Sequence, residues 1–421
     1  MNYSKLASKL RSKISHFSGY VSKNLDKTAQ RFVNEAIYGI MYSQSVMLTE
    51  IGRSLETTVS LKKIEERFCR QLKKEGLWEN IHRQVLCEAG PRIKDDTLLI
   101  LDLGDLYKKY AEKMEYLAKV RDGSEGGEIV NGYWTAQVIG AHLGESETMP
   151  LFHELYSQEA PGFKSENAQI TGAIDMVTEY CDNRGIWVID RGGDRGVLFN
   201  HLLEKNDTKR FIVRLVGNRN LEHGSKKVLA LELANNCKTP YRDTIVIEEK
   251  GKEKVYQISY GYVPVKLPGR DTQLYMLVVK GFGQKPMMLL TTEPLRRNRK
   301  VLYRILGCYM KRWSIEETIR FVKQTYDLEN IRVLKYVRLR NMMALLLAVF
   351  YFIAAKLDTK QKLKVMTGHV LKQAKRIFGV PDFKYYALGD GLSSIFKRSP
   401  GKIKTESTNK PNRSQLDFGF T

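Results

Sequence analysis

Residues 96–106 read DTLLILDLGDL, a continuous apolar run that ends in acidic residues. A run of this kind indicates a strand that is buried on both faces of a sheet. A second, shorter run, IWVIDRGGD at 186–194, also ends at an acid. The two runs therefore predict two buried strands, each followed by a carboxylate.

The segments around these two runs predict the rest of a sheet. Further strands are expected at 131–143, 147–157 and 211–216, with helices at 165–185 and 195–207. The order of three strands, helix, strand, helix and strand matches the ribonuclease-H-like layout, in which parallel strands extend an antiparallel trio. We therefore predict an α/β protein with a ribonuclease-H-like core and a mixed sheet.

A chain of 421 residues exceeds one ordinary core, so we expect several domains. The core is expected to be interrupted by a β-rich insert and flanked by helical N-terminal and C-terminal regions. The expected segments are 1–90 (helical, basic, DNA-binding), 91–217 (first part of the core), 218–290 (β-rich insertion, an inserted sheet), 291–357 (second part of the core) and 358–421 (a basic helix at 360–378 and a disordered tail beyond Ser394). For residues 1–90, an ordinary helical bundle with a basic surface is an equal alternative.

The charge balance indicates a polyanionic partner. Lys and Arg outnumber Asp and Glu by 69 to 47, a formal charge of +22, which suits DNA, RNA or an acidic membrane surface. The five cysteines form no CxxC pair, which argues against zinc and a disulfide framework and fits a reducing cytoplasm. The basic N-terminus lacks the apolar region of a secretory signal. The longest apolar run, 342–355, is shorter than the ~20 residues of a membrane span, so we expect a buried helix and no membrane partner.

Three acids are candidates for a metal site. Asp102 and Asp190 end neighbouring strands in this topology, and Glu316 lies on a helix expected to pack against the sheet. Carboxylates gathered in this way repel one another, and two Mg²⁺ ions with oxygen ligands would neutralise them. Asp105 is a rival to Asp102, which we prefer because it directly ends the apolar run. Alternatively, each Asp is a turn or cap residue, and Asp190 pairs with Arg191 or caps the following helix.

Cations accompany Glu316 on its predicted helix. Tyr309, Arg312, Glu316 and Lys323 are separated by three, four and seven residues, which places them within roughly 60° of one another on a helix. A carboxylate among cations suits a metal-assisted phosphodiester site. The alternative is a solvated helix face with an ion pair from Arg312 to Glu316.

The segment YMKRWSIEETIRFVK at 309–323 fits the pattern Tyr-(2)-Arg-(3)-Glu-(6)-Lys and resembles the signature of the insertion-sequence-4-like DDE transposases of bacteria. VIDRGGD at 188–194, LTTEPL at 290–295 and the β-rich insert also resemble features of that family, over roughly residues 30–357. The resemblance implies that Asp102, Asp190 and Glu316 bind the metal ions, Mg²⁺ with Mn²⁺ as a possible substitute. It also implies that Tyr309, Arg312 and Lys323 hold phosphates of the transposon end.

The resemblance further implies an activity. Members of that family cut double-stranded DNA at transposon ends through a hairpin and join the ends to target DNA, which calls for a homodimer in the synaptic complex and a place at the bacterial nucleoid. A flipped base beside the cut usually stacks on an aromatic side chain. Some relatives place a Trp where this chain has Met287 and Met288, and Trp134 and Trp313 are other candidates. The alternatives are a catalytically inactive DNA-binding protein derived from a transposase, and a nuclease that cuts without strand transfer.

Overall fold

The computed structural model describes residues 3–108, 111–121, 128–145, 147–205, 207–249, 252–370 and 385–405. The chain forms two compact units. The sheet unit comprises Leu86–Tyr110 and Tyr116–Arg320, and the helical unit comprises Met1–Val85, Ala111–Glu115 and Phe321–Thr421. The chain passes between the units four times, so neither unit is continuous in sequence.

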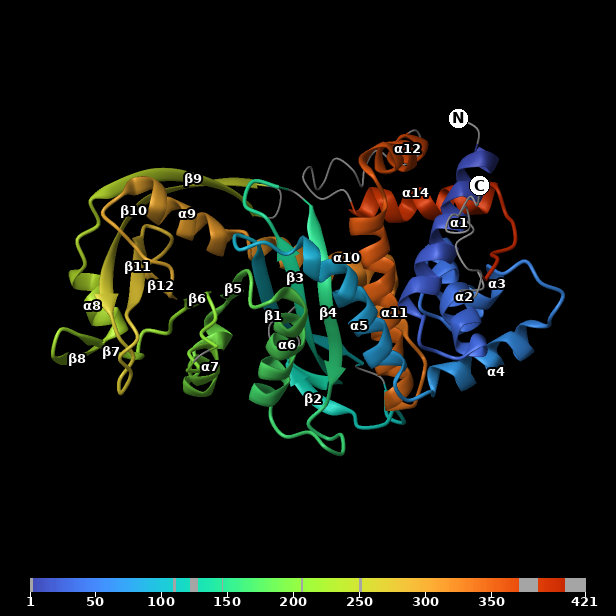
Figure 1. Cartoon of the computed structure of the whole chain (residues 1–421), viewed down its shortest axis with the longest axis horizontal. Coiled ribbons are helices and arrows are strands. Elements are labelled where there is room, and N and C mark those ends of the chain that lie inside the picture. Colours follow the sequence, from blue (N-terminus) through green and yellow to red (C-terminus); the bar gives the residue numbers. More distant parts are fainter. Residues whose placement is uncertain are drawn as a thin grey trace, which may run out of the picture. The chain divides into compact units, whose positions relative to one another are not determined.

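The sheet unit combines one large mixed sheet with short helices (Figure 1). Its strands are β1 (Leu98–Tyr107), β2 (Ala118–Arg121), β3 (Ile129–Ala141), β4 (Thr148–Tyr156), β5 (Ile186–Ile189), β6 (Phe211–Arg214), β7 (Asn220–His223), β8 (Lys226–Leu229), β9 (Tyr241–Glu249), β10 (Lys252–Val265), β11 (Leu274–Lys280) and β12 (Met287–Thr291). Its helices are η1 (Gly90–Arg92), α6 (Glu166–Cys181), η2 (Arg191–Gly193), α7 (Gly196–Leu202), α8 (Ala230–Asn236), α9 (Arg299–Met310) and α10 (Trp313–Thr325), whose last five residues belong to the helical unit.

The central strands have the predicted ribonuclease-H-like arrangement. β1 pairs antiparallel with β3, and β3 pairs antiparallel with β4. β5 lies parallel to β1 on its other side, and β6 lies parallel to β5. α6, whose first turn is capped by the Ser165 hydroxyl accepting from the Ala168 N–H, connects the antiparallel strands to the parallel ones. The sequence prediction of the core is confirmed.

The β-rich insert extends this sheet, which corrects our expectation of an inserted sheet. β12 pairs antiparallel with β6, and β11, β10 and β9 follow in that order, at the end of the sheet coloured yellow in Figure 1. β7 and β8 form a separate two-stranded ribbon. The physical reason is that β6 would otherwise leave an unpaired edge, and the apolar β12 satisfies its backbone groups.

β1 is longer than its apolar run suggested. Leu98–Leu101 are buried between β3 and β5 and pair in parallel with Ile186–Ile189. Beyond the end of β5, β1 continues to Tyr107 because β3 remains its partner as far as Gly132. Our prediction that Asp102 ends its strand is therefore wrong, because Asp102 lies inside β1. It does directly follow the half of the strand that is buried on both faces.

The helical unit packs around one apolar helix, α11. Its elements are α1 (Tyr3–Val21), α2 (Lys27–Ser43), α3 (Leu48–Arg53), α4 (Leu61–Leu72), α5 (Leu77–Ala89, whose last four residues belong to the sheet unit), η3 (Leu328–Asn330), α11 (Tyr336–Tyr351), the π-helical turn η4 (Phe352–Lys356), α12 (Thr359–Val370) and α14 (Tyr385–Arg398). By length and composition, Tyr336–Lys356 is the one helix among the described residues that could cross a membrane, but 83% of its apolar window is buried within the protein. A helix that is apolar all round and covered by other helices is a core helix.

The C-terminal region is more ordered than we predicted. α14 continues past Ser394 to Arg398, because Ile395 and Phe396 are buried in the helical unit. The chain beyond it is held by side chains of the first two helices: Arg11 donates to the Ser399 carbonyl, and Asn34 donates to the Lys404 carbonyl. Of the basic helix predicted at 360–378, residues 360–370 lie in α12, and 371–378 lie outside the described residues, as does the tail from 406.

We predict that Asn341→Ala destabilises the helical unit. Asn341 is 2% exposed; its amide donates to the carbonyls of Leu72 and Lys74, each at 2.8 Å, and accepts from the Trp78 N–H at 3.0 Å. Removing it leaves two buried backbone groups and the part-buried Lys74 carbonyl without this partner, at a cost of about 2–4 kcal/mol. A urea or thermal unfolding measurement tests this, with Asn236→Ala on the exposed end of α8 as control. Equal stability of the two variants would contradict the prediction.

Candidate active site

Two aspartates are set side by side by the register of parallel strands. Leu101 of β1 pairs with Ile189 of β5, so the next residues, Asp102 and Asp190, are neighbours across the two strands. Adjacent strands lie about 4.8 Å apart. The Asp102 side chain is 16% exposed. The sheet thus holds two carboxylates together at the point where β5 ends.

Glycines let the chain turn sharply after Asp190. The Asp190 Oδ1 accepts a hydrogen bond from the Gly192 N–H at 2.7 Å, so Asp190 caps the 3-10 turn η2. This is the capping role that the sequence analysis gave as an alternative to metal binding. A Cβ on Gly193 would lie 2.5 Å from the Ile189 side chain, and one on Gly192 would lie 2.9 Å from Asp190 Oδ1. Any larger residue would displace β5 or the carboxylate itself, which explains the sequence Gly192–Gly193.

Charged residues that the sequence analysis did not single out hold this turn in place. Asp194, whose side chain is fully buried, accepts from the Val216 N–H at 2.6 Å and from Arg219 Nε at 2.5 Å. Arg195 donates to Glu166 and, at 3.0 Å, to Asn167. Both contacts tie the residues after Asp190 to neighbouring elements of the sheet unit. The charged run DRGGDR was the only signal for them.

The signature segment is not one helix. α9 ends at Met310, α10 begins at Trp313, and the Arg312 N–H donates to the Tyr309 carbonyl three residues back at 3.0 Å. Our prediction of a continuous helix from Tyr309 to Lys323 is therefore wrong at residues 311–312, where the tighter i→i−3 bond interrupts the α-helical pattern. The turn remains right-handed, so Arg312 and Glu316 still approach each other.

Arg312 is the centre of the site. Its guanidinium lies 3.8 Å from Asp102 Oδ2 (Nη1) and donates to Glu316 Oε1 at 2.9 Å (Nη2). Its Cζ lies 5.8 Å from the centre of the Tyr309 ring. The Arg312 side chain is only 9% exposed. One buried cation therefore contacts two of the three predicted acids and the predicted tyrosine.

The pKa shifts of Asp102 and Arg312 reflect burial first and then the charges of the neighbouring site residues. Burial raises the pKa of Asp102 to about 7; Arg312 opposes this rise, and the charges of Asp190 and Glu316 add to it. Burial alone would lower the pKa of Arg312, but Tyr309, Asp102, Glu316 and Asp190 outweigh it and raise that pKa. All three predicted acids thus interact electrostatically with one guanidinium.

Two other candidate residues take different places. Asp105 lies three positions after Asp102 in the same strand, so it faces the opposite side of the sheet. Lys323 lies seven residues after Glu316 in α10, in the part of that helix that belongs to the helical unit, and its Nζ is 4.0 Å from Glu329 Oε1. The sheet unit therefore brings together Asp102, Asp190, Tyr309, Arg312 and Glu316.

The donor chemistry of the acids suits a divalent cation. Burial first, and then the charges of Asp190 and Glu316, raise the pKa of Asp102, and a bound cation would favour its charged form. Carboxylate oxygens are the ligands that Mg²⁺ prefers. Within the ranges that the structure describes, no three His, Cys, Asp or Glu side chains are grouped to hold a metal ion as they stand, since Arg312 contacts both Asp102 and Glu316. Glu316 is 50% exposed and therefore free to change rotamer.

The LTTEPL segment has a structural role in this fold. Glu293 is buried and receives two hydrogen bonds from Arg210, at 2.7 and 2.8 Å, with Arg304 3.7 Å away. A bidentate pair of this kind fixes the end of β12 to the start of β6. Of the side chains considered for a flipped base, Met287 and Met288 are buried in β12, and Trp134 packs against a small cluster of Ala118, Val120 and Val130.

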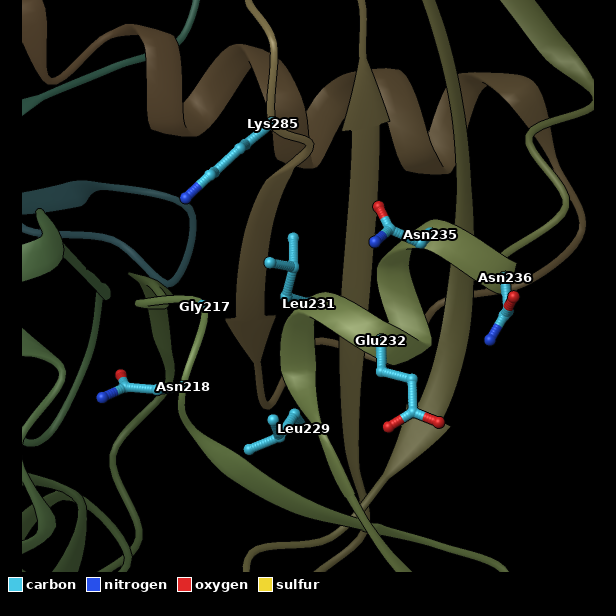
Figure 2. Close-up of a pocket in the computed structure, with 8 residues that line it drawn as sticks. All are labelled: Gly217, Asn218, Leu229, Leu231, Glu232, Asn235, Asn236 and Lys285. Carbon is cyan, nitrogen blue, oxygen red and sulfur yellow. The ribbon is translucent and has the colours of Figure 1, made fainter.

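A cavity of about 710 Å³ opens in the inserted part of the sheet (Figure 2). It is lined by Gly217, Asn218, Leu229, Leu231, Glu232, Asn235, Asn236 and Lys285. Figure 2 shows Asn236 and Glu232 pointing away from Gly217 and Leu231, while Lys285 and Asn218 point to the other side. Its polar groups do not converge, so this cavity defines no ligand.

Comparisons with known proteins add little to these observations. No protein-family model matches the sequence, and no curated protein matches it. Among solved structures, the chain is similar to a piggyBac transposase in a synaptic complex with hairpin DNA, with a TM-score of 0.43 and 12% identity over 97% of this chain and 86% of that one. At this similarity the match carries no argument about function.

We predict that Asp102→Asn stabilises the protein at alkaline pH. Because the folded-state pKa of Asp102 is raised from 3.8 to about 7, the folded protein binds a proton more tightly than the unfolded chain. Wild-type stability should therefore fall as pH rises through that window, by about 1–4 kcal/mol at ~1.4 kcal/mol per pKa unit.

Thermal unfolding in EDTA at pH 4 to 8 tests this prediction. The neutral Asn avoids burying a charge and removes the repulsion from Asp190 and Glu316, so the variant should melt higher than the wild type at pH 8, with a flatter pH dependence. A variant that melts lower than the wild type at pH 8 would show that the charged Asp102 is stabilising, against the prediction.

Proposed function

We propose that this chain is a DDE-type DNA transposase that cuts transposon ends and joins them to target DNA. The observation that carries the proposal is the meeting of Asp102, Asp190 and Glu316 around Arg312 in a ribonuclease-H-like core. The three acids come from separate parts of the sequence. Their order along the chain, Asp102, Asp190 and Glu316, is the order that the resemblance to the transposase family implies. The details proposed are those of the insertion-sequence-4-like family, including cut-and-paste transposition through hairpin ends.

In this proposal Asp102, Asp190 and Glu316 hold two Mg²⁺ ions, for which Mn²⁺ can substitute. Bound there, the ions would supply an activated nucleophile and stabilise the leaving oxygen of a phosphodiester. The protein contributes fixed carboxylates: Asp102 and Asp190 are set by strand register, and Asp190 by its turn. Glu316 would exchange its contact with Arg312 for the ions, which its exposure permits.

Arg312 and Tyr309 are proposed to bind phosphates of the DNA end. Arg312 Nε and the Tyr309 hydroxyl are buried and have no hydrogen-bond partner among the described residues. Buried polar groups in folded proteins are nearly always satisfied, so these two indicate acceptors that a phosphate would provide. Lys323 is assigned the same role by the resemblance alone.

The proposed DNA partner follows from the charge of the chain, and the proposed oligomeric state follows from the reaction. A net charge of +22 suits double-stranded DNA, both transposon terminal repeats and target. Cutting and joining two ends requires both to be held together, so we propose a homodimer in the synaptic complex. We place the protein at the nucleoid in the bacterial cytoplasm.

We predict that Asp102→Asn, Asp190→Asn and Glu316→Gln each reduce cleavage of DNA carrying the element's ends more than ~100-fold, because even changes to residues that only support metal ligands cost about 10–100-fold in metal affinity or activity. DNA binding should remain. The measurement is Mg²⁺-dependent nicking followed on a gel, beside a binding assay. Asp105→Asn, on the opposite face of the same strand, is the matched control and should cut normally. Unchanged cutting by all three variants would refute the site.

Strand transfer separates a transposase from a nuclease that only cuts. We predict that reactions with a second plasmid yield joined products and hairpin ends alongside nicked ones, since the 3′-hydroxyl released by the first cut can be the next nucleophile. Sequencing the junctions provides the measurement. Nicked DNA without joined product would show that the protein is a nuclease without strand transfer. DNA binding without any cutting would support the alternative of a catalytically inactive DNA-binding protein derived from a transposase.

A further inference from the structure

The segment that carries α9 is strongly basic. Between Glu293 and Glu316 the chain has no acid and seven cations: Arg296, Arg297, Arg299, Lys300, Arg304, Lys311 and Arg312. Arg312 is the centre of the active site and follows the end of α9 by two residues. The segment therefore brings a series of positive charges up to the site.

α9 extends from the inserted strands of the sheet to its core. At its start, Arg299 pairs with Asp243 of β9, and just beyond its end Arg312 contacts Asp102 of β1. Several strands separate β9 from β1 in the sheet, and Figure 1 shows α9 lying against β10 and β11 on the way. The helix has 12 residues, which rise about 18 Å.

Two of the α9 arginines have structural roles. Arg299 pairs with Asp243, and Arg304 Nη2 lies 3.7 Å from Glu293 Oε2. The side chain of Asn298 accepts hydrogen bonds from N–H groups of the first turn and so caps the helix. These contacts hold α9 on the sheet. An anion that binds here would therefore be held by the other side chains.

The remaining cations near the start of α9 face solvent. Arg296, Arg297 and Lys300 are exposed, and none of the three is in an ion pair with any residue that the structure describes. Tyr303, one turn after Lys300, is 43% exposed, and its ring lies 6.3 Å from that of Tyr260 in β10. We call Arg296, Arg297, Lys300 and Tyr303 the α9 surface. Arg, Lys and Tyr side chains are usual donors to DNA phosphates.

The charges around the α9 surface do not cancel. Arg210, which also pairs with Glu293, adds a sixth cation to the five at 296–304. Four acids act on these cations or on α9 itself, namely Asp95, Asp96, Asp243 and Glu293. An excess of two positive charges remains, and it lies on the exposed side chains that are not in ion pairs.

We propose that the α9 surface binds the backbone of the duplex DNA that continues from the reacting phosphate. The inference rests on the proposed function for the reaction at Arg312 and deepens it by giving the DNA a path. Successive phosphates of one strand are about 3.4 Å apart along a duplex. A helix of about 18 Å therefore separates the two contacts by about five phosphates.

The test uses the full-length chain with Arg297→Gln and Lys300→Gln combined. Affinity for a duplex that carries the element's end is measured without Mg²⁺ between about 50 and 300 mM salt. The charge-matched control is Lys62→Gln with Lys63→Gln, two exposed lysines of α4. We expect the α9 variant to lose ~10-fold in affinity at ~100 mM salt, with a log–log salt slope shallower by about 1 to 2, because each phosphate neutralised contributes about 0.9. The control should change the slope by less than ~0.5.

Neutral phosphates locate the contact. Methylphosphonates are placed one at a time along both strands of the same duplex, and the affinity is measured for each. In the wild type we expect two groups of sensitive positions, one at the cut and one about five phosphates away. The α9 variant should be insensitive at the second group alone. A wild type with no second group, or a second group that stays sensitive in the variant, would contradict the proposal.

The outcomes separate this inference from the proposed function. If the wild type cuts DNA and the α9 variant matches the control in affinity and slope, the α9 assignment alone is overturned. If the α9 variant loses affinity and slope but no form of the protein cuts DNA, the α9 surface binds DNA and the proposed function fails. If the α9 variant keeps its DNA affinity but no longer binds phosphatidylserine vesicles that the wild type binds, the surface meets an acidic membrane and the DNA assignment is wrong.

A charge-preserving variant separates lost charge from lost structure. Arg297→Lys with Lys300→Arg keeps both charges and should bind DNA as the wild type does. If it binds as weakly as the glutamine variant at an unchanged melting temperature, charge on the α9 surface is not what holds the DNA, against the proposal. Equal melting temperatures of the wild type and the glutamine variants show that all forms are folded.

Discussion

The site depends on like charges held together against their repulsion. Two unit charges 4 Å apart interact by about 4 kcal/mol at an effective dielectric of 20, and the backbone gives Asp102 and Asp190 no freedom to separate. The sheet register places them side by side, and the turn after Asp190 fixes the second carboxylate. Arg312 offsets part of this repulsion from within the site. Burial is the main reason that the pKa of Asp102 is raised, and the charges of Asp190 and Glu316 add to the rise. Perturbed pKa values of this kind cluster at functional sites.

Other contacts in the sheet unit hold the strands and the loop that carry Asp102 and Asp190. Parallel pairing of β1 with β5 requires both strands to be buried, and their apolar residues provide that. The ion pairs of Asp194 with Arg219 and of Arg195 with Glu166 hold the loop beyond β5. Arg210 and Glu293 fix the strand at which the insert joins the core. Strands of the insert and of the core therefore belong to one continuous sheet within the 125 residues that separate Asp190 from Glu316.

Sequence patterns predicted the core because its signals are local. The apolar runs at 98–101 and 186–189 identified β1 and β5, and known topology then made Asp102 and Asp190 neighbours. Features that depend on pairing with distant segments were missed. β1 continues past Asp102 only because β3 accompanies it, and β12 joins β6 only because that edge is free. The helix break at residues 311–312 and the helix α14 were also missed. In α14, two glycines and a pair of serines, which are weak helix formers, interrupt the apolar residues.

The most direct test of the central claim is to count bound Mn²⁺ by electron paramagnetic resonance on the full-length protein with DNA ends present. If Asp102, Asp190 and Glu316 share the ions, we expect about two Mn²⁺ per chain in the wild type and a loss of this binding in Asp190→Asn, with Asp105→Asn unchanged. Equal Mn²⁺ binding by the wild type and Asp190→Asn would show that the acids gathered around Arg312 are not the metal site.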